Sequence, residues 1–192
     1  MRLFIGIPMP EEYKRMLGDI QRAWKDKFQS RLTWTRPENW HLTLKFLGEV
    51  DEERLPDLKE FLDDFSFREL TLQAGSSGFF GSKGQYRVAW LGVEGEVQRL
   101  AELAHDMDQG LAGLGFEPEK KAFKAHLTLA RIKKFVKSDP WRGFSSYVDN
   151  MDWPSFTAQQ IVLWQSSLTP KGPEYKALKR CILSQQIHTY SR

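Results

Sequence analysis

The tetrapeptide His-Leu-Thr-Leu occurs twice in this chain, in Trp40-His41-Leu42-Thr43-Leu44-Lys45-Phe46 and in Ala125-His126-Leu127-Thr128-Leu129-Ala130-Arg131. Because side chains alternate between the two faces of a β-strand, each copy predicts a strand with both leucines on one face and the histidine and threonine on the other. The leucine face fits a hydrophobic core. Two such strands, side by side or across a groove, would bring two imidazoles and two hydroxyls into one shared space.

This set of side chains suits the chemistry of a phosphate ester. One of His41 and His126 can take a proton from water while the other gives a proton to a leaving oxygen. The hydroxyls of Thr43 and Thr128 can donate hydrogen bonds to non-bridging phosphate oxygens. A lone His-Leu-Thr-Leu strand fits a half-exposed edge strand equally well. The alternation of leucines does not require His and Thr at matching positions in two places, so the repetition favours a functional site.

Two cations flank the second motif. Lys124 precedes His126 by two residues, so it is predicted on the same strand face and is a candidate phosphate ligand. Arg131 follows His126 by five residues, so simple alternation places it on the opposite face. Arg131 can bind phosphate only if the strand bends or ends there, and a solvent-exposed or lobe-stapling arginine is the alternative.

The same rule applies around the first motif. It places Lys45 on the face of His41, and it places Trp40 and Phe46 on the leucine side. The two aromatic residues are therefore predicted to lie in the core rather than to stack on bases.

The composition limits the class of protein. The 192 residues are 41% hydrophobic with a net charge of +3, which fits one packed domain and permits nucleic-acid binding. The single cysteine, Cys181, excludes an internal disulfide and a cysteine-rich zinc site, and it is consistent with a reducing, cytoplasmic location. No apolar run approaches the ~18 residues of a membrane span. We expect no membrane association.

Strand and helix patterns alternate along the chain. Period-2 and helical spacings predict strands at 2–8, 32–35, 40–47, 70–74, 87–93, 125–132, 156–166 and 175–186, and helices at 11–28, 51–65, 95–114 and near 138–147. Asp51 is expected to cap the second helix. The glycine-rich segment 75–84 predicts a long hairpin connection; it could cradle a phosphate, but it lacks the order of a P-loop. Several hairpins predict an α+β fold with largely antiparallel sheets. Each motif strand follows its own helix, which suggests two related halves in a single compact domain, 1–192.

Four segments resemble a known family. Met1–Pro8, His41–Gly48, His126–Arg131 and Gln165–Tyr175 resemble, in order, the LigT-like RNA 2′,3′-cyclic phosphodiesterases of the two-histidine (2H) phosphoesterase superfamily, first named 2′-5′ RNA ligases. The family often has Arg-Pro before the second histidine, where this chain has Lys124-Ala125. The positive charge is kept and the proline is lost.

The resemblance implies a fold and a reaction. The fold would have two pseudo-symmetric lobes, each with a mostly antiparallel sheet flanked by helices, and a site in the groove between them. The reaction would open the cyclic phosphate at RNA ends to leave a 2′-phosphate, without a cofactor. His41 would be the general acid and His126 the general base, with Thr43 and Thr128 holding phosphate oxygens.

The sequence leaves other functions open. Ligation of a 2′,3′-cyclic end to a 5′-hydroxyl uses the same residues in the same way, so the sequence does not rank it against hydrolysis. A non-catalytic RNA-binding module has no need of paired imidazoles. Two His with two Thr are a poor ligand set for a transition metal, so we expect none. The expected partners are RNA with 2′,3′-cyclic phosphate ends, tRNA fragments among them, or small cyclic nucleotides, acted on by a monomer.

Overall fold

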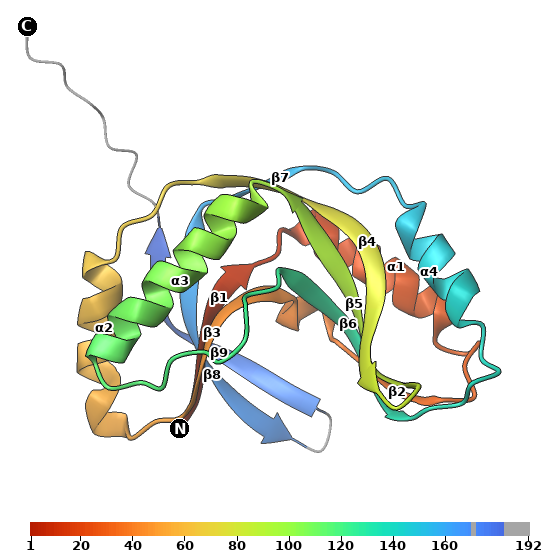
Figure 1. Cartoon of the computed structure of the whole chain (residues 1–192), viewed down its shortest axis with the longest axis horizontal. Coiled ribbons are helices and arrows are strands. Elements are labelled where there is room, and N and C mark those ends of the chain that lie inside the picture. The colour runs from red at the N-terminus through yellow and green to blue at the C-terminus, as the bar shows by residue number, and fades with distance from the viewer. Residues whose placement is uncertain (170–171, 183–192) are drawn as a thin grey trace, which may run out of the picture.

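The computed structural model describes residues 1–169 and 172–182, so the part of the last predicted strand at 183–186 lies outside the described residues. Two antiparallel sheets face each other across the middle of the molecule, each with helices on its outer side (Figure 1). The predicted α+β class with two lobes is confirmed. None of the helices in the described part of the chain is long and apolar enough to cross a membrane.

The first sheet contains the first motif. Its order is β3-β1-β8-β9, with β1 at Arg2–Pro8, β3 at His41–Glu49, β8 at Gln160–Thr169 and β9 at Gly172–Ile182. Its outer face is covered by α2 at Leu55–Asp64 and α3 at Val97–Gly113 (Figure 1). A short 3-10 turn, η2 at Glu52–Arg54, precedes α2, and Asp51 before it makes no capping hydrogen bond through its side chain. The prediction that Asp51 caps this helix is wrong, because the 3-10 turn separates it from the first turn of α2.

The second sheet contains the second motif. Its order is β2-β6-β5-β4-β7, with β2 at Arg31–Trp34, β6 at His126–Lys134, β5 at Gln85–Gly95, β4 at Leu70–Ser82 and β7 at Phe156–Ala158. It is covered by α1 at Glu11–Trp24 and α4 at Trp141–Asp149 (Figure 1). The predicted hairpin is confirmed, but the glycine-rich segment is itself strand: β4 continues through it to a tight turn at Lys83 and Gly84, both with positive φ.

The chain crosses between the lobes in each half. In the first half β1 is followed by α1, which packs on the second sheet, and the chain then returns through η1, Pro37–Asn39, to β3 beside β1. In the second half β5 is followed by α3, which packs on the first sheet, and the chain returns to β6 beside β5. The predicted repeat of helix and motif strand is therefore present. Because each helix covers the other half's sheet, the lobes share one hydrophobic core.

The motif strands present the two faces that alternation predicts. Leu42, Leu44, Leu127 and Leu129 are 1%, 5%, 0% and 0% exposed and belong to the main core cluster. The histidine and threonine of each motif are half-buried on the opposite face. Burial of the leucines, each contributing about 1.5–3 kcal/mol, therefore fixes which face carries the polar side chains.

Candidate active site

His41 is held at the start of β3 by two hydrogen bonds. Its Nδ1 lies 2.7 Å from the backbone oxygen of Asn39, and its Nε2 lies 3.0 Å from Oγ1 of Thr43. A carbonyl oxygen only accepts, so Nδ1 carries a proton and donates it to Asn39. In the neutral imidazole, Nε2 is then the acceptor and the Thr43 hydroxyl is the donor.

Three aromatic rings surround His41. Phe4, Trp164 and Tyr175 lie with their ring centroids 4.7, 5.4 and 5.4 Å from the imidazole. Burial among these rings lowers the pKa of His41 from 6.5 to about 4, against the opposing effect of the Asn39 carbonyl. His41 is therefore neutral at neutral pH when the site is empty.

The pKa of His41 also reports on its charged neighbours. The positive charges of His126 and Arg131 lower it further, after the effect of burial. The charge of Arg131 also acts on Tyr175, whose pKa is raised by burial. Arg131 on β6 is therefore within electrostatic range of His41 and Tyr175 on the opposite sheet, and His126 is within range of His41.

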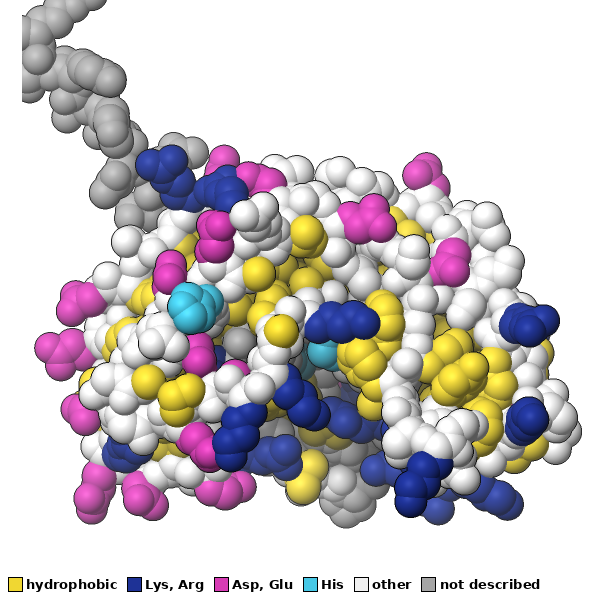
Figure 2. All heavy atoms as spheres, viewed as in Figure 1, with side chains coloured by type: hydrophobic (Ala, Val, Ile, Leu, Met, Phe, Trp, Pro, Cys, Tyr) yellow, Lys and Arg dark blue, Asp and Glu magenta, His cyan; other side chains and the backbone are white. Residues whose placement is uncertain are grey.

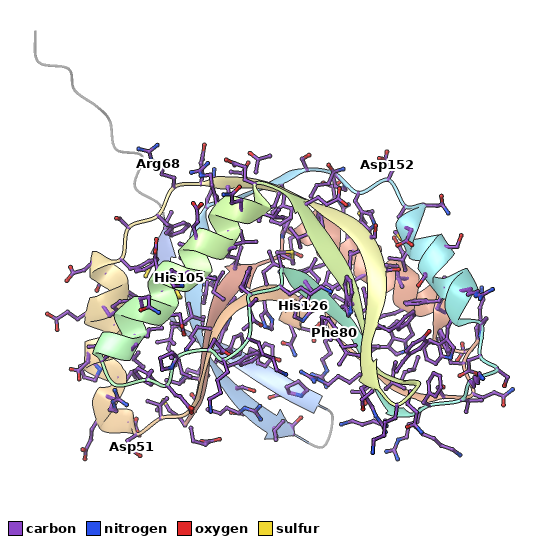
Figure 3. All side chains as sticks on the ribbon, viewed as in Figure 1. Asp51, Arg68, Phe80, His105, His126 and Asp152 are labelled. Carbon is purple, nitrogen blue, oxygen red and sulfur yellow. The ribbon has the colours of Figure 1, made fainter. Side chains whose placement is uncertain are left out.

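His126 uses the same anchor as His41. Its Nδ1 lies 2.8 Å from the backbone oxygen of Lys124, again the carbonyl two residues earlier. This hydrogen bond fixes the orientation of the His126 ring and leaves Nε2 as the nitrogen that can contact a substrate. The Phe80 ring packs against the imidazole edge to face at 5.0 Å, and the two are neighbours near the centre of Figure 3.

A β-bulge brings Arg131 to the histidine face. Trp90 pairs with Thr128, but Ala89 pairs with Ala130, so one extra residue, Leu129, is inserted in β6. Leu129 and Ala130 are both buried, 0% and 1% exposed, and the alternation is reversed after them. The prediction from simple alternation that Arg131 faces away from His126 is wrong. The bulge is the strand irregularity that was needed to bring Arg131 to the face of His126.

The same bulge occurs in β3. Gly6 pairs with Thr43 and Ile5 with Lys45, so Leu44 is the extra residue there. Lys45 is consequently turned into the protein, where it is 2% exposed and its Nζ lies 2.5 Å from Oδ1 of Asp108.

Two predictions around the first motif are therefore wrong. Lys45 does not share the face of His41, and Phe46 is not in the core but 54% exposed, with its ring 6.0 Å from Phe4. Trp40, which precedes the bulge at Leu44, is 2% exposed as predicted.

Lys124 lies on an aromatic surface beside His126. Its Nζ is 4.3 Å from the centroid of the Trp90 ring and 5.1 Å from that of Phe80. The contact with phosphate that the sequence predicts for Lys124 stays a prediction.

The space around His126 is open and has basic side chains around it. Figure 2 shows one histidine in a central hollow, at the place of His126 in Figure 3, with Lys and Arg side chains around it and acidic side chains gathered over α2 and α3. A cavity of about 400 Å³ opens beside His41, lined by Trp164, Tyr175 and Arg180 among others. Within the described residues there is no group of three or more His, Cys, Asp or Glu that could hold a metal ion.

The aromatic neighbours of His41 could not be predicted from the sequence. Phe4, Trp164 and Tyr175 come from three different strands of the first sheet, and only strand pairing brings them to His41. The alternation of side chains in β8 and β9 predicts which sheet face Trp164 and Tyr175 lie on, but no local sequence pattern indicates that these rings contact His41.

Comparisons with known proteins agree with this architecture. The family model described as "LigT like Phosphoesterase" matches the chain twice, at residues 7–90 and 91–175, so each match contains one His-x-Thr motif. A Methanocaldococcus jannaschii relative named "RNA 2′,3′-cyclic phosphodiesterase" is 34% identical over 93% of this chain and 99% of its own length. A Thermotoga maritima relative of the same name is 36% identical over 94% and 95%.

Solved structures show the same fold. A Thermus thermophilus protein is 29% identical with a TM-score of 0.78, covering 95% of this chain and 98% of that one. E. coli LigT, crystallised with 3′-AMP, is 26% identical with a TM-score of 0.76, covering 96% and 98%. The two matches of the family model and the full-length relatives together show that this chain belongs to the LigT-like phosphoesterase family.

Proposed function

We propose that this chain hydrolyses 2′,3′-cyclic phosphate ends of RNA to 2′-phosphomonoesters. The observation that carries the proposal is the repeated anchor of the two histidines. Each Nδ1 is bound to the carbonyl two residues earlier, so that each Nε2 is the ring nitrogen that can face the substrate; that of His41 lies beside the Thr43 hydroxyl. The name of the relatives as RNA 2′,3′-cyclic phosphodiesterases and the 3′-AMP bound to E. coli LigT support the choice of substrate.

The proposed reaction is an in-line displacement at phosphorus. His126 takes a proton from water, whose oxygen attacks phosphorus, while the bond from phosphorus to O3′ breaks. His41 gives a proton to the departing O3′. Thr43 and Thr128 donate hydrogen bonds to the two equatorial oxygens, and Arg131 and Lys124 stabilise the negative charge that accumulates there.

The role of His41 as an acid requires a proton that the empty site does not hold. Burial keeps its pKa near 4, but a bound phosphate places a negative charge beside the ring and opposes the effects of burial and of the neighbouring cations. Binding of the substrate would thus raise the pKa of His41, and the ring would take its proton from solvent. In the protonated ring, Nε2 becomes a donor, and the Thr43 hydroxyl is released from Nε2 to donate to the phosphate.

Several finer points belong to the same proposal. We take the reaction to need no metal, because imidazoles and cations supply the proton transfers and the charge stabilisation. Ligation of the 2′,3′-cyclic phosphate end to the 5′-hydroxyl of another RNA end is the second reaction proposed for the same site. A cytoplasmic monomer acting on RNA ends, tRNA fragments among them, is the expected setting. A non-catalytic RNA-binding module is the alternative class. It predicts that the wild type has no turnover, whereas an enzyme predicts that His41→Ala and His126→Ala abolish turnover and leave RNA binding nearly intact.

A substrate with sulfur in place of the leaving O3′ tests the two roles. A thiolate departs without a proton, so His41→Ala should regain most of its lost rate on this substrate, while His126→Ala should not. The oxygen substrate serves as the control for both variants. Rescue of His126→Ala instead of His41→Ala would reverse the assignment, and the depressed pKa of His41 would then belong to a general base.

A further inference from the structure

An aromatic surface that the proposed reaction does not use lies next to His126. Trp90 on β5 is the strand partner of Thr128, and its indole stacks on Phe80 of β4 with centroids 5.1 Å apart and an interplanar angle of 28°. We call Trp90 and Phe80 the aromatic platform. Because the sheet order is β6-β5-β4 and β6 is the strand nearest to β3, the platform lies beyond His126 as seen from His41.

Glycines let the Trp90 ring lie flat on the sheet. A Cβ at Gly78 would be 2.3 Å from Cζ2 of the indole, and a Cβ at Gly92 would be 3.0 Å from the backbone oxygen of Ser76 and 3.4 Å from Cζ3. One face of the indole is therefore seated on strand backbone, and the Phe80 ring and the Lys124 ammonium also lie against the indole. Part of the glycine-rich segment thus serves to hold an aromatic ring rather than a phosphate.

The Trp90 ring is in contact with a weakly held cation. The Lys124 ammonium lies 4.3 Å from the centroid of Trp90. At an exposed site such a contact is weaker than the stacking of a nucleobase on an aromatic side chain. A base can therefore displace Lys124, whose flexible stem lets the ammonium follow the phosphate.

There is room for a base at this position. A hollow of about 460 Å³ adjoins Trp90 and Lys124 on the side away from Phe80 and His126, which do not line it. Ser76, Glu94 and Gln98 line it with polar groups that can bind the edge of a base. Its volume falls in the range of about 300–1,000 Å³ that small-molecule sites occupy.

We propose that the aromatic platform binds the base of a second nucleoside, the one whose oxygen attacks phosphorus. The inference rests on the proposed function, in which the cyclic phosphate's own ribose lies toward His41 and the attacking oxygen lies toward His126. When a 5′-hydroxyl attacks in place of water, its proton passes to His126 and the bond from phosphorus to O5′ forms. The bond to O3′ breaks, and O3′ takes the proton of His41. The platform is then the acceptor subsite of strand joining.

Two stable diesters of equal charge test this subsite. One is 3′-deoxyadenosine 2′-(methyl phosphate), and the other is 3′-deoxyadenylyl-(2′→5′)-adenosine. Neither has the 3′-hydroxyl needed to form a cyclic phosphate, so neither can be cleaved by that route. They differ only in the second nucleoside. Dissociation constants would be measured by calorimetry for the wild type and for Trp90→Leu, Trp90→Phe and Tyr147→Leu. Tyr147 is an exposed aromatic residue on α4, packed against Trp24, and serves as the matched control.

The wild type should bind the dinucleotide at least roughly tenfold more tightly than the methyl diester, as expected for one stacked base. Trp90→Leu should lose that gain while keeping its affinity for the methyl diester, Trp90→Phe should keep most of it, and Tyr147→Leu should match the wild type. Circular dichroism checks folding, and Phe80→Leu replaces Trp90→Leu if the latter does not fold.

Three results would overturn the subsite. They are the absence of a gain in the wild type, a gain that survives in Trp90→Leu, and a loss in Trp90→Leu that is equal for both diesters. The last result would place the base of the cyclic nucleotide itself on the platform. Failure of the proposed function is distinguishable, because it would be seen as a wild type that leaves the cyclic phosphate intact while the gain for the dinucleotide persists.

Discussion

The indole N–H of Trp40 donates a 2.7 Å hydrogen bond to the backbone oxygen of Thr128. Trp40 directly precedes His41 on the first sheet, and Thr128 lies in the second motif on the other sheet, so one buried bond connects the two motifs. It restrains the separation of the two histidines, which both must contact a single phosphate in the proposed reaction.

Replacing Trp40 by Phe should slow catalysis more than it weakens binding. The change keeps an aromatic ring but removes the bond to Thr128, and a lost buried hydrogen bond costs about 1–3 kcal/mol of stability. We expect kcat on a 2′,3′-cyclic nucleotide to fall about tenfold, equivalent to about 1.4 kcal/mol in the barrier, with a smaller change in KM.

Trp141→Phe is the matched control for this variant. Trp141 is also buried and its indole donates to the backbone oxygen of Val136, at 2.9 Å, but this bond does not join the motifs. It should lower stability by a similar amount and leave kcat unchanged. Equal losses of kcat in both variants would show that the bond from Trp40 acts only through stability.

The depressed pKa of His41 should make folding stability depend on pH. Above pH 6.5 the ring is neutral in both the folded and the unfolded chain, and the folded state has its full stability. Between pH 6.5 and about 4 the unfolded chain binds a proton that the folded chain excludes, so stability is lost as the pH falls. The difference between the His41 pKa of 6.5 in the unfolded chain and about 4 in the fold corresponds to roughly 3 kcal/mol of folding free energy.

Urea unfolding at pH 7.5 and pH 4.5 measures this effect. The wild type should lose more stability between the two pH values than His41→Gln does, by roughly 2–3 kcal/mol, since the variant has no group titrating at this position. An equal loss in both proteins would mean that His41 is protonated as readily in the fold as in the unfolded chain.

Arg131 should stabilise the transition state, because the bulge in β6 places it on the same strand face as His126. Arg131→Met is expected to lower kcat/KM by about 10²–10³-fold, the usual cost of removing one donor that stabilises developing charge. Lys134→Met, at the end of the same strand, removes the same charge and should change the rate less than twofold. Similar losses in both variants would indicate a general effect of charge on RNA attraction, which added salt would suppress.

Much of the architecture could be predicted from the sequence because it depends on local patterns. The leucines of the two motifs fix the core face of β3 and β6, and the repeated tetrapeptide indicated two related halves. The positions of His41 and His126 within those strands also follow from alternation alone.

The alternation of side chains could not predict the β-bulges in β3 and β6, where the alternation is interrupted. The extra residues Leu44 and Leu129 each reverse the alternation for the residues that follow directly, which exposes Phe46, buries Lys45 and turns Arg131 toward the histidines. No local signal marks these bulges. Lys45 is stable in the interior only because partners 63 and 72 positions away, Asp108 and the carbonyl of Glu117, meet its ammonium there.

The proposed function is tested most directly by the fate of one substrate. An RNA oligonucleotide with a 2′,3′-cyclic phosphate end would be incubated with the protein in excess EDTA, and the product isomer identified by nuclear magnetic resonance. We predict complete conversion to the 2′-phosphate with a free 3′-hydroxyl, at the same rate with and without EDTA, and no conversion by His41→Ala or His126→Ala proteins that remain folded. A 3′-phosphate product, an unopened ring, or activity lost in EDTA and restored by a divalent cation would contradict it.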